Sequence, residues 1–269
     1  MKPKVHVWSE IDFSENPKRF ISYLDKAYEF PFVQKFKAKA LHLLALQEGD
    51  FVLELGCGTG RDASEMASRV GKKGGVIAVD SSKGMILDAK TRYDPCRLPL
   101  QFQQAHAHQL PFEDGIFSAC FSDRVFQHLE NPLLCMNELR RVMKKQSRIV
   151  VCDVDWTSLH IHGVDEEIFA RIRALRCRSI CNPSMGRQLN SLLQEADFDH
   201  IQVSTETVSL DSLDTADPLL KLTETLALAQ ELHLISEKHH KTLLDTWRAG
   251  SFSAALTGSI AYARKSNTL

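Results

Sequence analysis

The 269-residue sequence predicts an α/β fold with a doubly wound, seven-stranded, mostly parallel sheet. Short apolar runs alternate along the chain with segments whose apolar residues recur at helical spacing. The first run, 51–53, ends at Glu54 and turns over closely spaced glycines into a polar segment with helical spacing. The second run, 76–79, ends at Asp80, about one strand–helix–strand unit downstream, which predicts two neighbouring parallel strands.

Two helices are predicted ahead of the first strand, over residues 20–28 and 32–44, with Pro31 as the break between them. We expect residues 1–48 to form an N-terminal helical cap, which either covers a ligand or pads one edge of the sheet. Residues 49–269 are expected to form the main domain, with a helical insertion at about 211–250 before the last strand.

The stretch 51–60, FVLELGCGTG, places glycine at every second position after the first strand. Glycine is used where φ must be positive or where a ligand approaches the backbone closely. The N–H groups of such a turn and of the following helix then face that ligand. Gly56, Gly58 and Gly60 therefore indicate either a nucleotide-type ligand or a plain strand-to-helix turn.

Asp80, at the tip of the second strand, favours the ligand interpretation. An acid at this position hydrogen-bonds a ribose diol in nucleotide-binding α/β proteins. Ser81 and Ser82 then offer caps for a helix around residues 84–91.

The remaining strands are predicted at 100–105, 116–121, 148–153, 201–208 and 254–263. Further helices are predicted from Asn131-Pro132, over 166–178, from Gly186 to about Ala196, and within the insertion from Asp217-Pro218 and from Ser236. Ligands bind beyond the carboxyl ends of the strands in such a sheet, so the ends of the fourth and fifth strands are expected at the site. These ends carry Asp123, Arg124, Asp155 and Trp156.

The stretch VLELGCGTG resembles motif I of the class I, Rossmann-like S-adenosylmethionine-dependent methyltransferases. The nearest pattern is that of the small-molecule group similar to the ubiquinone and menaquinone C-methyltransferases. The resemblance runs from Val52 to about Val151 and includes Leu110-Pro111-Phe112 and the stretch FQHLENPLLCMNELRRVMK. It implies S-adenosylmethionine as cofactor, with the glycine loop against its methionine moiety and Asp80 on its ribose hydroxyls.

The implied cofactor-binding set is spread over the ends of the first four strands. His106-Ala107 stands where the family usually has Asp-Ala, whose carboxylate takes the adenine amino group. A neutral imidazole can still accept one hydrogen bond there. The residues implied are Glu54, Gly56, Cys57, Gly58, Thr59, Gly60, Asp80, Ser81, Met85, His106, Ala107, Asp123 and Arg124.

Methyl transfer from a sulfonium is an in-line displacement, so alignment matters more than a catalytic triad. A general base is required only where the nucleophile must lose a proton. His128 and Asp155 are the catalytic candidates, although His128 can equally cap or pack a helix. Trp156, His160 and Arg187 are the substrate-binding candidates, and Arg187 can instead form a structural ion pair with an acid of the fifth strand.

The composition excludes several classes of partner. Lys plus Arg total 33 against 34 for Asp plus Glu, with no basic tract, so no nucleic-acid partner is expected. No apolar run is long enough to span a bilayer and no apolar signal core is visible, so we expect a cytoplasmic protein without integral membrane association. Seven scattered cysteines without a Cys-x-x-Cys motif predict no metal site.

Three functions remain open at this point. The first is an S-adenosylmethionine-dependent methyltransferase that acts on a small-molecule acceptor. The second is a non-catalytic S-adenosylmethionine-binding partner or regulatory protein of the same fold, for which His106 is the one hint. The third is an NAD-dependent oxidoreductase, which the glycine spacing and Leu110-Pro111-Phe112 oppose. The acceptor, the element that is methylated and the choice between monomer and homodimer do not follow from the sequence.

Overall fold

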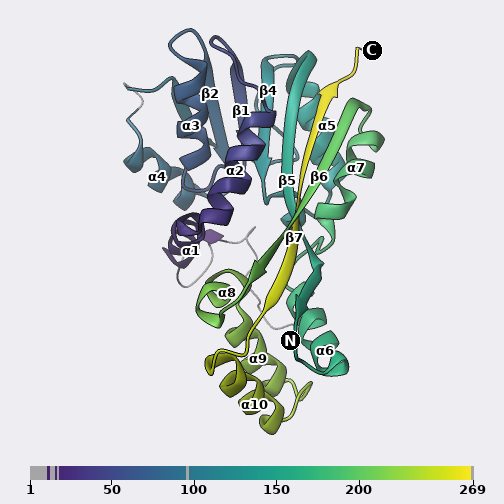
Figure 1. Cartoon of the computed structure of the whole chain (residues 1–269). Coiled ribbons are helices and arrows are strands. Elements are labelled where there is room, and N and C mark those ends of the chain that lie inside the picture. Colours follow the sequence, from purple (N-terminus) through teal and green to yellow (C-terminus); the bar gives the residue numbers. More distant parts are fainter. Residues whose placement is uncertain (1–10, 13–15, 17, 95–96, 268–269) are drawn as a thin grey trace.

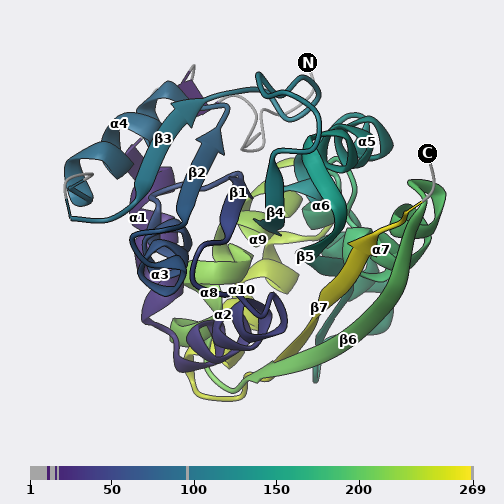
Figure 2. The ribbon, with the colours of Figure 1, turned by 90° about the horizontal axis from the view of Figure 1, so that it is seen from above.

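Seven strands form one sheet in the order β3-β2-β1-β4-β5-β7-β6 in the computed structural model, which describes residues 11–12, 16, 18–94 and 97–267 (Figures 1 and 2). The strands are β1 (Phe51–Leu55), β2 (Gly75–Asp80), β3 (Leu100–Gln104), β4 (Phe117–Asp123), β5 (Met143–Ile161), β6 (Phe198–Leu210) and β7 (Ala254–Lys265). Strands β1 to β5 run parallel, while β7 is antiparallel to its neighbours β5 and β6. The predicted doubly wound, mostly parallel sheet is therefore confirmed.

Helices cover both faces of this sheet, which is why its central strands are almost continuously apolar. On one face lie α2 (Pro31–Leu43), α3 (Arg61–Val70) and α4 (Lys83–Arg92), with Leu41 and Met66 fully buried against the strands. On the other face lie α5 (Pro132–Val142) and α7 (Met185–Glu195), which bury Met136 and Leu189. Each such side chain contributes roughly 1.5–3 kcal/mol by its removal from water.

Local signals fix several helix ends where the sequence predicts them. Pro31 occupies the first turn of α2 and separates it from α1 (Lys18–Glu29). The Asn131 side chain caps α5 by accepting a hydrogen bond from the Leu134 N–H at 3.0 Å. Ser236 caps α10 (Glu237–Arg248) in the same way, through the His239 N–H at 3.1 Å.

Strand β5 is longer than the sequence predicts. The prediction ends it at residue 153, but it continues to Ile161 because β7 pairs with it as far as Ala254. The register between β5 and β7 shifts between Asp155 and His160. Asp155 pairs with Thr257, but His160, further along β5, pairs with Ala255. Residues 155 and 156 therefore lie within the strand and not at its end, which corrects the prediction.

The insertion contains three helices, where the sequence predicts two. They are α8 (Leu213–Leu220), α9 (Leu222–Glu231) and α10. Helix α8 begins one turn earlier than predicted because Ser212 caps it through the Thr215 N–H at 3.2 Å, so Pro218 lies inside α8. None of the described helices is long and apolar enough to cross a membrane.

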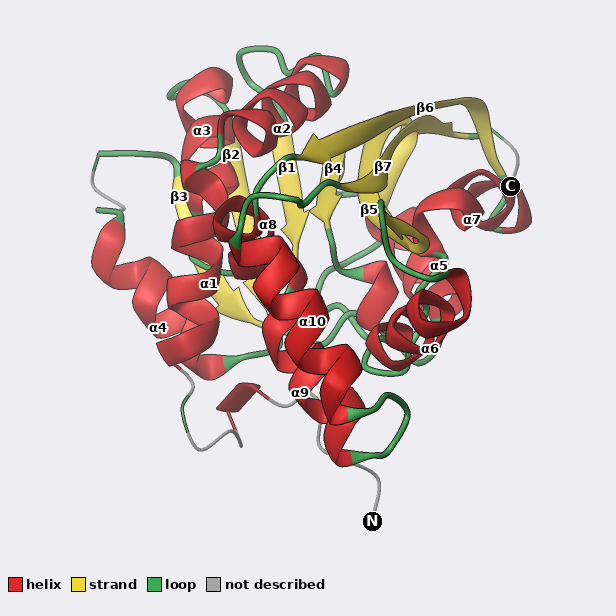
Figure 3. Ribbon diagram, turned by 60° about the horizontal axis from the view of Figure 1, so that its bottom comes forward, coloured by secondary structure: helices red, strands yellow, loops and turns green. Residues whose placement is uncertain are grey.

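These three helices share a second hydrophobic core with α6 (Glu166–Cys177) and with the extended ends of β5, β6 and β7. Phe169, Leu226 and Trp247 are among its buried members. Figure 3 shows α8, α9 and α10 crossing below the carboxyl edge of the sheet, with α1 on one side and α6 on the other. The fold thus places a helical layer opposite the ends of the parallel strands.

Candidate functional site

A cavity of about 1170 Å³ lies between the carboxyl edge of the sheet and this helical layer. We call its two sides the strand half and the helix half. The strand half is lined by the β1 loop, the tip of β2, the start of α4 and residues 104–108. The helix half is lined by Trp156 of β5, by the end of α6 with residues 179–181, and by α9 with Lys221 before it. Helix α1 lines the cavity beside both, and residues 123–130 lie between them.

The glycine loop forms the floor of the strand half. Gly56 and Gly58 line the cavity with positive φ angles of 74° and 52°. A Cβ on Gly56 would lie 2.2 Å from Val125 Cγ2, and one on Gly58 would lie 2.8 Å from Leu24 Cδ1. These positions therefore require glycine both for the left-handed backbone and for the close approach of α1 and the β4 loop.

Asp80 ties the tip of β2 to the glycine loop. Its Oδ2 accepts a hydrogen bond from the Gly58 N–H at 2.9 Å, and its Oδ1 accepts one from the Ser82 N–H at 2.9 Å. Burial raises the pKa of Asp80, although these backbone hydrogen bonds oppose the shift. Each carboxylate oxygen has a second lone pair, so Asp80 can bind a hydroxyl group from the cavity without releasing the loop.

A buried ion network lies next to the strand half. Lys37 of α2 reaches Asp123 Oδ2 at 2.6 Å and also contacts Asp62 of α3. Burial alone would lower the pKa of Lys37, but the Asp123 and Asp62 carboxylates raise it above its usual range. Arg124 Nε lies 3.3 Å from the same Asp123 oxygen. Asp123 is therefore held by two cations, Lys37 from the N-terminal part of the chain and its own neighbour Arg124.

Glu54 lies beneath the glycine loop, 3% exposed, and does not line the cavity. Among the described residues, neither Glu54 Oε2 nor Asp62 Oδ1 has a hydrogen-bond partner. Burial, and then the Asp62 carboxylate, raise the pKa of Glu54 well above its usual range. The nearby Asp123 and Asp80 carboxylates raise the pKa of Glu54 further, while Lys37 opposes the shift.

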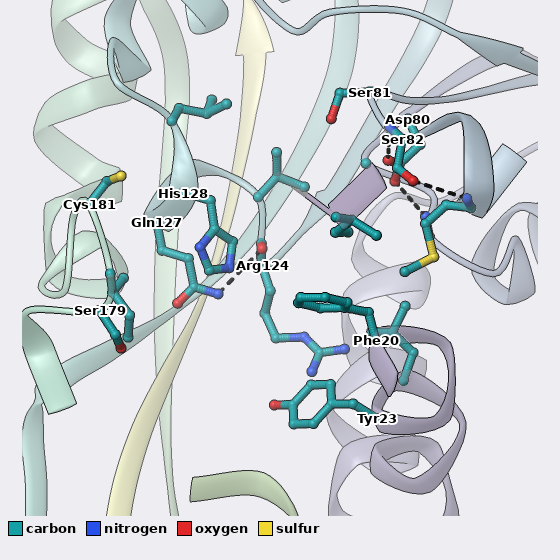
Figure 4. Close-up of a pocket in the computed structure, with 18 of the residues that line it drawn as sticks. Phe20, Tyr23, Asp80, Ser81, Ser82, Arg124, Gln127, His128, Ser179 and Cys181 are labelled. Atoms are coloured by element: carbon teal, nitrogen blue, oxygen red, sulfur yellow. Dashed lines mark hydrogen bonds between the residues drawn. The ribbon is translucent and has the colours of Figure 1, made fainter. Parts of the chain in front are cut away.

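Arg124, Gln127 and His128 separate the two halves, and Figure 4 shows the Arg124 side chain directed toward Phe20 and Tyr23 of α1. Arg124 has a positive φ of 58°, which turns the chain sharply after β4. The Gln127 side chain donates to the Arg124 carbonyl at 3.3 Å. Its Oε1 accepts a hydrogen bond from the Trp156 indole N–H at 2.5 Å, which fixes the ring at the boundary of the helix half.

His128 is a neutral imidazole in this environment. Burial lowers its pKa to about 3, and the charges of Arg124 and Arg176 act in the same direction. A neutral imidazole presents one donor and one acceptor nitrogen, so it can take a hydrogen bond from a hydroxyl group in the cavity.

The structure brings most of the predicted site residues to this one cavity. They are Gly56, Gly58, Asp80, Ser81, Met85, His106, Ala107, Asp123, Arg124, His128 and Trp156. His106 lies exposed at the rim, and Met85 is buried below it at the start of α4. Like Glu54, the loop residues Cys57, Thr59 and Gly60 do not line the cavity. Gly60 faces the Phe102 ring, which a Cβ at this position would meet.

Asp155, His160 and Arg187 are not brought to the cavity. Asp155 accepts a hydrogen bond from the Thr157 N–H at 3.0 Å and pairs with Arg187, whose Nε lies 3.8 Å from Asp155 Oδ2. His160 packs edge-on against the His162 ring, 4.6 Å away. His160 lies further along β5 than Trp156, while Asp155 pairs with Arg187 of α7, so the structural ion pair is the alternative that the structure supports for Arg187.

Sequence reasoning missed most of the helix half. Arg176, Ser179 and Lys221 line it, and they come from the end of α6 and from the junction of α8 and α9. No motif marks these positions, because their place in the cavity depends on how the insertion packs on the sheet. Phe20 and Leu24 of α1 also line the cavity, in the N-terminal region for which the sequence leaves open whether it covers a ligand or pads the sheet.

Comparisons with known proteins agree with this architecture. The sequence profile of a methyltransferase domain matches residues 46–202. An uncharacterized 37.1 kDa protein in transposon TN4556 of Streptomyces fradiae is 33% identical over 239 residues, which cover 88% of this chain and 69% of that protein. The demethylmenaquinone methyltransferase of Lactococcus lactis is 28% identical over 135 residues, which cover 50% of this chain and about half, 54%, of that enzyme.

Solved structures show the same fold. Phosphoethanolamine N-methyltransferase 2 of Haemonchus contortus, in complex with phosphomonomethylethanolamine and S-adenosylhomocysteine, superposes with a TM-score of 0.62 at 18% identity, over 98% of this chain and 61% of that one. The YcgJ protein of Bacillus subtilis superposes with a TM-score of 0.58 at 18% identity, over 84% of this chain and 99% of that one.

The chain belongs to the methyltransferase domain family, because the profile covers more than half of it. The protein is an S-adenosylmethionine-dependent methyltransferase, with S-adenosylmethionine as its cofactor. Family membership decides against the NAD-dependent oxidoreductase and in favour of a methyltransferase.

Proposed function

We propose that the protein transfers the methyl group of S-adenosylmethionine to a small-molecule acceptor held in the helix half. The observation that carries this proposal is that the strand half and the helix half line a single cavity of about 1170 Å³. Pockets for one small molecule measure roughly 300–1,000 Å³. The cavity therefore has room for a cofactor and an acceptor side by side.

The strand half fits the cofactor. When bound, S-adenosylmethionine supplies a methyl group on a sulfonium, which needs no further activation. Gly56 and Gly58 would lie against the methionine moiety, and Asp80 would hold the ribose hydroxyls. Arg124 would pair with the methionine carboxylate, and His106 at the rim would accept a hydrogen bond from the adenine amino group.

The remaining contribution of the chain is alignment and exclusion of water. Trp156, 6% exposed and fixed by Gln127, would place the acceptor against the methyl group. We propose that the N-terminal region acts as a cap through α1, whose Phe20 and Tyr23 line the cavity. Positive charge disperses as the methyl group leaves sulfur, so a dry, partly apolar chamber favours the transfer.

His128 is the residue placed to accept a hydrogen bond from the acceptor, and it takes the proton only where the bound acceptor raises the pKa of the imidazole above about 3. It lines the cavity between the two halves, and its imidazole is neutral, whereas Asp155 lies outside and is paired with Arg187. If His128 accepts the proton, its replacement by Ala lowers turnover without weakening cofactor binding. If turnover by wild type and by His128→Ala depended on pH in the same way, His128 would instead be a packing residue.

The relatives support a small-molecule acceptor. They include a demethylmenaquinone methyltransferase, phytyl-naphthoquinone methyltransferases and fungal O-methyltransferases. The balance of 33 basic and 34 acidic residues gives no electrostatic reason to expect a nucleic-acid acceptor.

Two measurements test the proposal. Calorimetric titration should show micromolar binding of S-adenosylmethionine and S-adenosylhomocysteine and none of NADH. Mass spectrometry should then detect S-adenosylhomocysteine production with a panel of small quinols, phenols and aromatic acids, and none with DNA, RNA or unfolded protein. Cofactor binding followed by methylation of a macromolecule alone would overturn the small-molecule acceptor.

A further inference from the structure

We propose that the methyl acceptor is an apolar or aromatic molecule that carries a carboxylate, and that Arg176 anchors this carboxylate in the helix half. The inference rests on the proposed function and narrows its substrate class. It is carried by the position of one guanidinium group, by the charges around it and by the apolar side chains beside it.

The Arg176 guanidinium is held in a fixed orientation at the cavity wall. Its Nε donates to the Leu220 carbonyl at 3.0 Å, and its Nη1 donates to Ser179 Oγ at 2.7 Å. Its Cζ lies 4.2 Å from the centre of the Trp156 ring, so the group is stacked as well as hydrogen-bonded. No described residue accepts a hydrogen bond from Nη2. Part of a preorganised fork therefore remains available to a ligand.

No described carboxylate lies within ion-pair distance of Arg176. Arg124, by contrast, is paired with Asp123 at 3.3 Å. Burial lowers the pKa of Arg176, and the nearby Tyr23, Cys177 and Glu224 oppose this shift without cancelling it. Glu224 is itself exposed to solvent. Arg176 is half-buried, and a ligand carboxylate would give its guanidinium a charge-assisted hydrogen-bond partner at ion-pair distance.

The surroundings of Arg176 define the rest of the ligand. Trp156, Leu175, Ile180 and Leu228 line the helix half beside it, so an apolar or aromatic body would pack there. A carboxylate on Arg176 would also offset part of the positive charge that helps to hold the pKa of His128 at about 3. The bound acceptor would thereby make His128 a better proton acceptor.

A purely structural Arg176 is the competing explanation. Its bond to the Leu220 carbonyl connects the end of α6 to the junction of α8 and α9. A structural role predicts that replacement of Arg176 lowers the melting temperature and leaves the choice between charged and neutral ligands unchanged. The two explanations therefore differ in ligand discrimination and not in stability.

The test uses the full chain saturated with S-adenosylhomocysteine, whose affinity is measured first for every protein. If S-adenosylhomocysteine does not bind, the proposed function fails before the acceptor is considered. Naphthalene-2-carboxylate and naphthalene-2-carboxamide are then titrated calorimetrically, because they share shape and apolar area and differ in charge. We expect wild-type protein to prefer the carboxylate by about tenfold or more.

Variants assign the preference to one residue. Arg176→Gln should abolish it, Arg176→Lys should keep part of it, and both should bind S-adenosylhomocysteine like wild type. Arg178→Gln is the matched control, since Arg178 is exposed at the end of the same helix and does not line the cavity. Equal binding of both probes to wild type, no binding of the carboxylate, or a preference that survives in Arg176→Gln would each overturn the proposal.

Discussion

The two halves of the cavity are built in different ways. In and beside the strand half, charged side chains are held by the backbone and by each other. Asp80 accepts two backbone hydrogen bonds, and the neighbouring Lys37 binds two carboxylates. In the helix half, Arg176 has hydrogen bonds to a carbonyl and a hydroxyl but no carboxylate partner among the described residues. We propose that the first half is preorganised for the cofactor and that the second half leaves the Arg176 guanidinium for the carboxylate of the acceptor.

We expect the helix half to determine which acceptor binds. Parallel strand ends and a glycine loop are fixed by the sheet, so any member of the family can reuse them. The helix half depends on α6 and on the insertion, which pack on the extended ends of β5 and β7. Changes in the first half should therefore affect folding or cofactor binding, whereas changes in the second should affect the acceptor.

The largest effect is expected from the loss of the buried cation beside the strand half. Lys37→Met leaves Asp62 and Asp123 without their shared partner, so the free energy of unfolding should fall by about 3–5 kcal/mol. Lys39→Met is the matched control on the same helix, because its ion pair with Glu206 is half-exposed and should contribute about 1 kcal/mol or less. Equal losses in urea denaturation would mean that the network does not stabilise the strand half.

Gly58→Val should weaken S-adenosylhomocysteine binding by roughly 100-fold, which corresponds to about 2.7 kcal/mol. The new side chain would meet Leu24 of α1 and enter the strand half from a backbone with a φ of 52°. Gly163→Val shares the positive φ, at 74°, but has open space around it, so it should cost stability alone. Calorimetry that finds unchanged affinity in Gly58→Val would place the cofactor elsewhere.

Asp80→Ala should weaken binding of the same ligand by roughly 1–3 kcal/mol, because it removes a charged acceptor for the ribose and the anchor of the Gly58 N–H. Asp80→Asn should lose less affinity for S-adenosylhomocysteine than Asp80→Ala, since the amide oxygen preserves one of the two acceptor oxygens. Calorimetric affinities that match wild type in both variants would contradict the ribose assignment.

The smallest effect is expected from the ionisation of Asp153, which should make the free energy of unfolding depend on pH. Burial raises its pKa to about 8, while hydrogen bonds from the Val154 and Gln127 N–H groups oppose the shift. The pKa of Asp153 is higher in the folded protein than in the unfolded chain, so the proton on its carboxyl group stabilises the fold. This stabilisation is complete below about pH 4 and is lost as pH rises toward 8.

The free energy of unfolding of wild type, relative to Asp153→Asn, should therefore decrease between pH 5 and pH 8, by about 1 kcal/mol or more. Chemical denaturation at three pH values measures this difference. Parallel pH profiles for the two proteins would show that Asp153 is ionised in the folded state across this range.

The sequence predicts the sheet and the strand half well because both depend on local patterns. The glycine turn, Asp80 and the Asn131 cap each act through neighbours close in sequence or through one adjacent strand. The same reasoning does not anticipate that pairing with β7 extends β5 and carries His160 past the site. Nor does it anticipate that α7 brings Arg187 to Asp155, which lies outside the cavity. It also misses Arg176 and Lys221, since only the packing of the insertion brings them to the cavity.

The central claim is that cofactor and acceptor bind side by side in one cavity. A crystal structure of the protein with S-adenosylhomocysteine tests it most directly. We predict that the adenosine lies along Asp80 and His106 in the strand half, with the thioether sulfur facing His128, Trp156 and the helix half. An adenosine seated against Arg176 and α9, or a sulfur directed away from the helix half, would contradict the account.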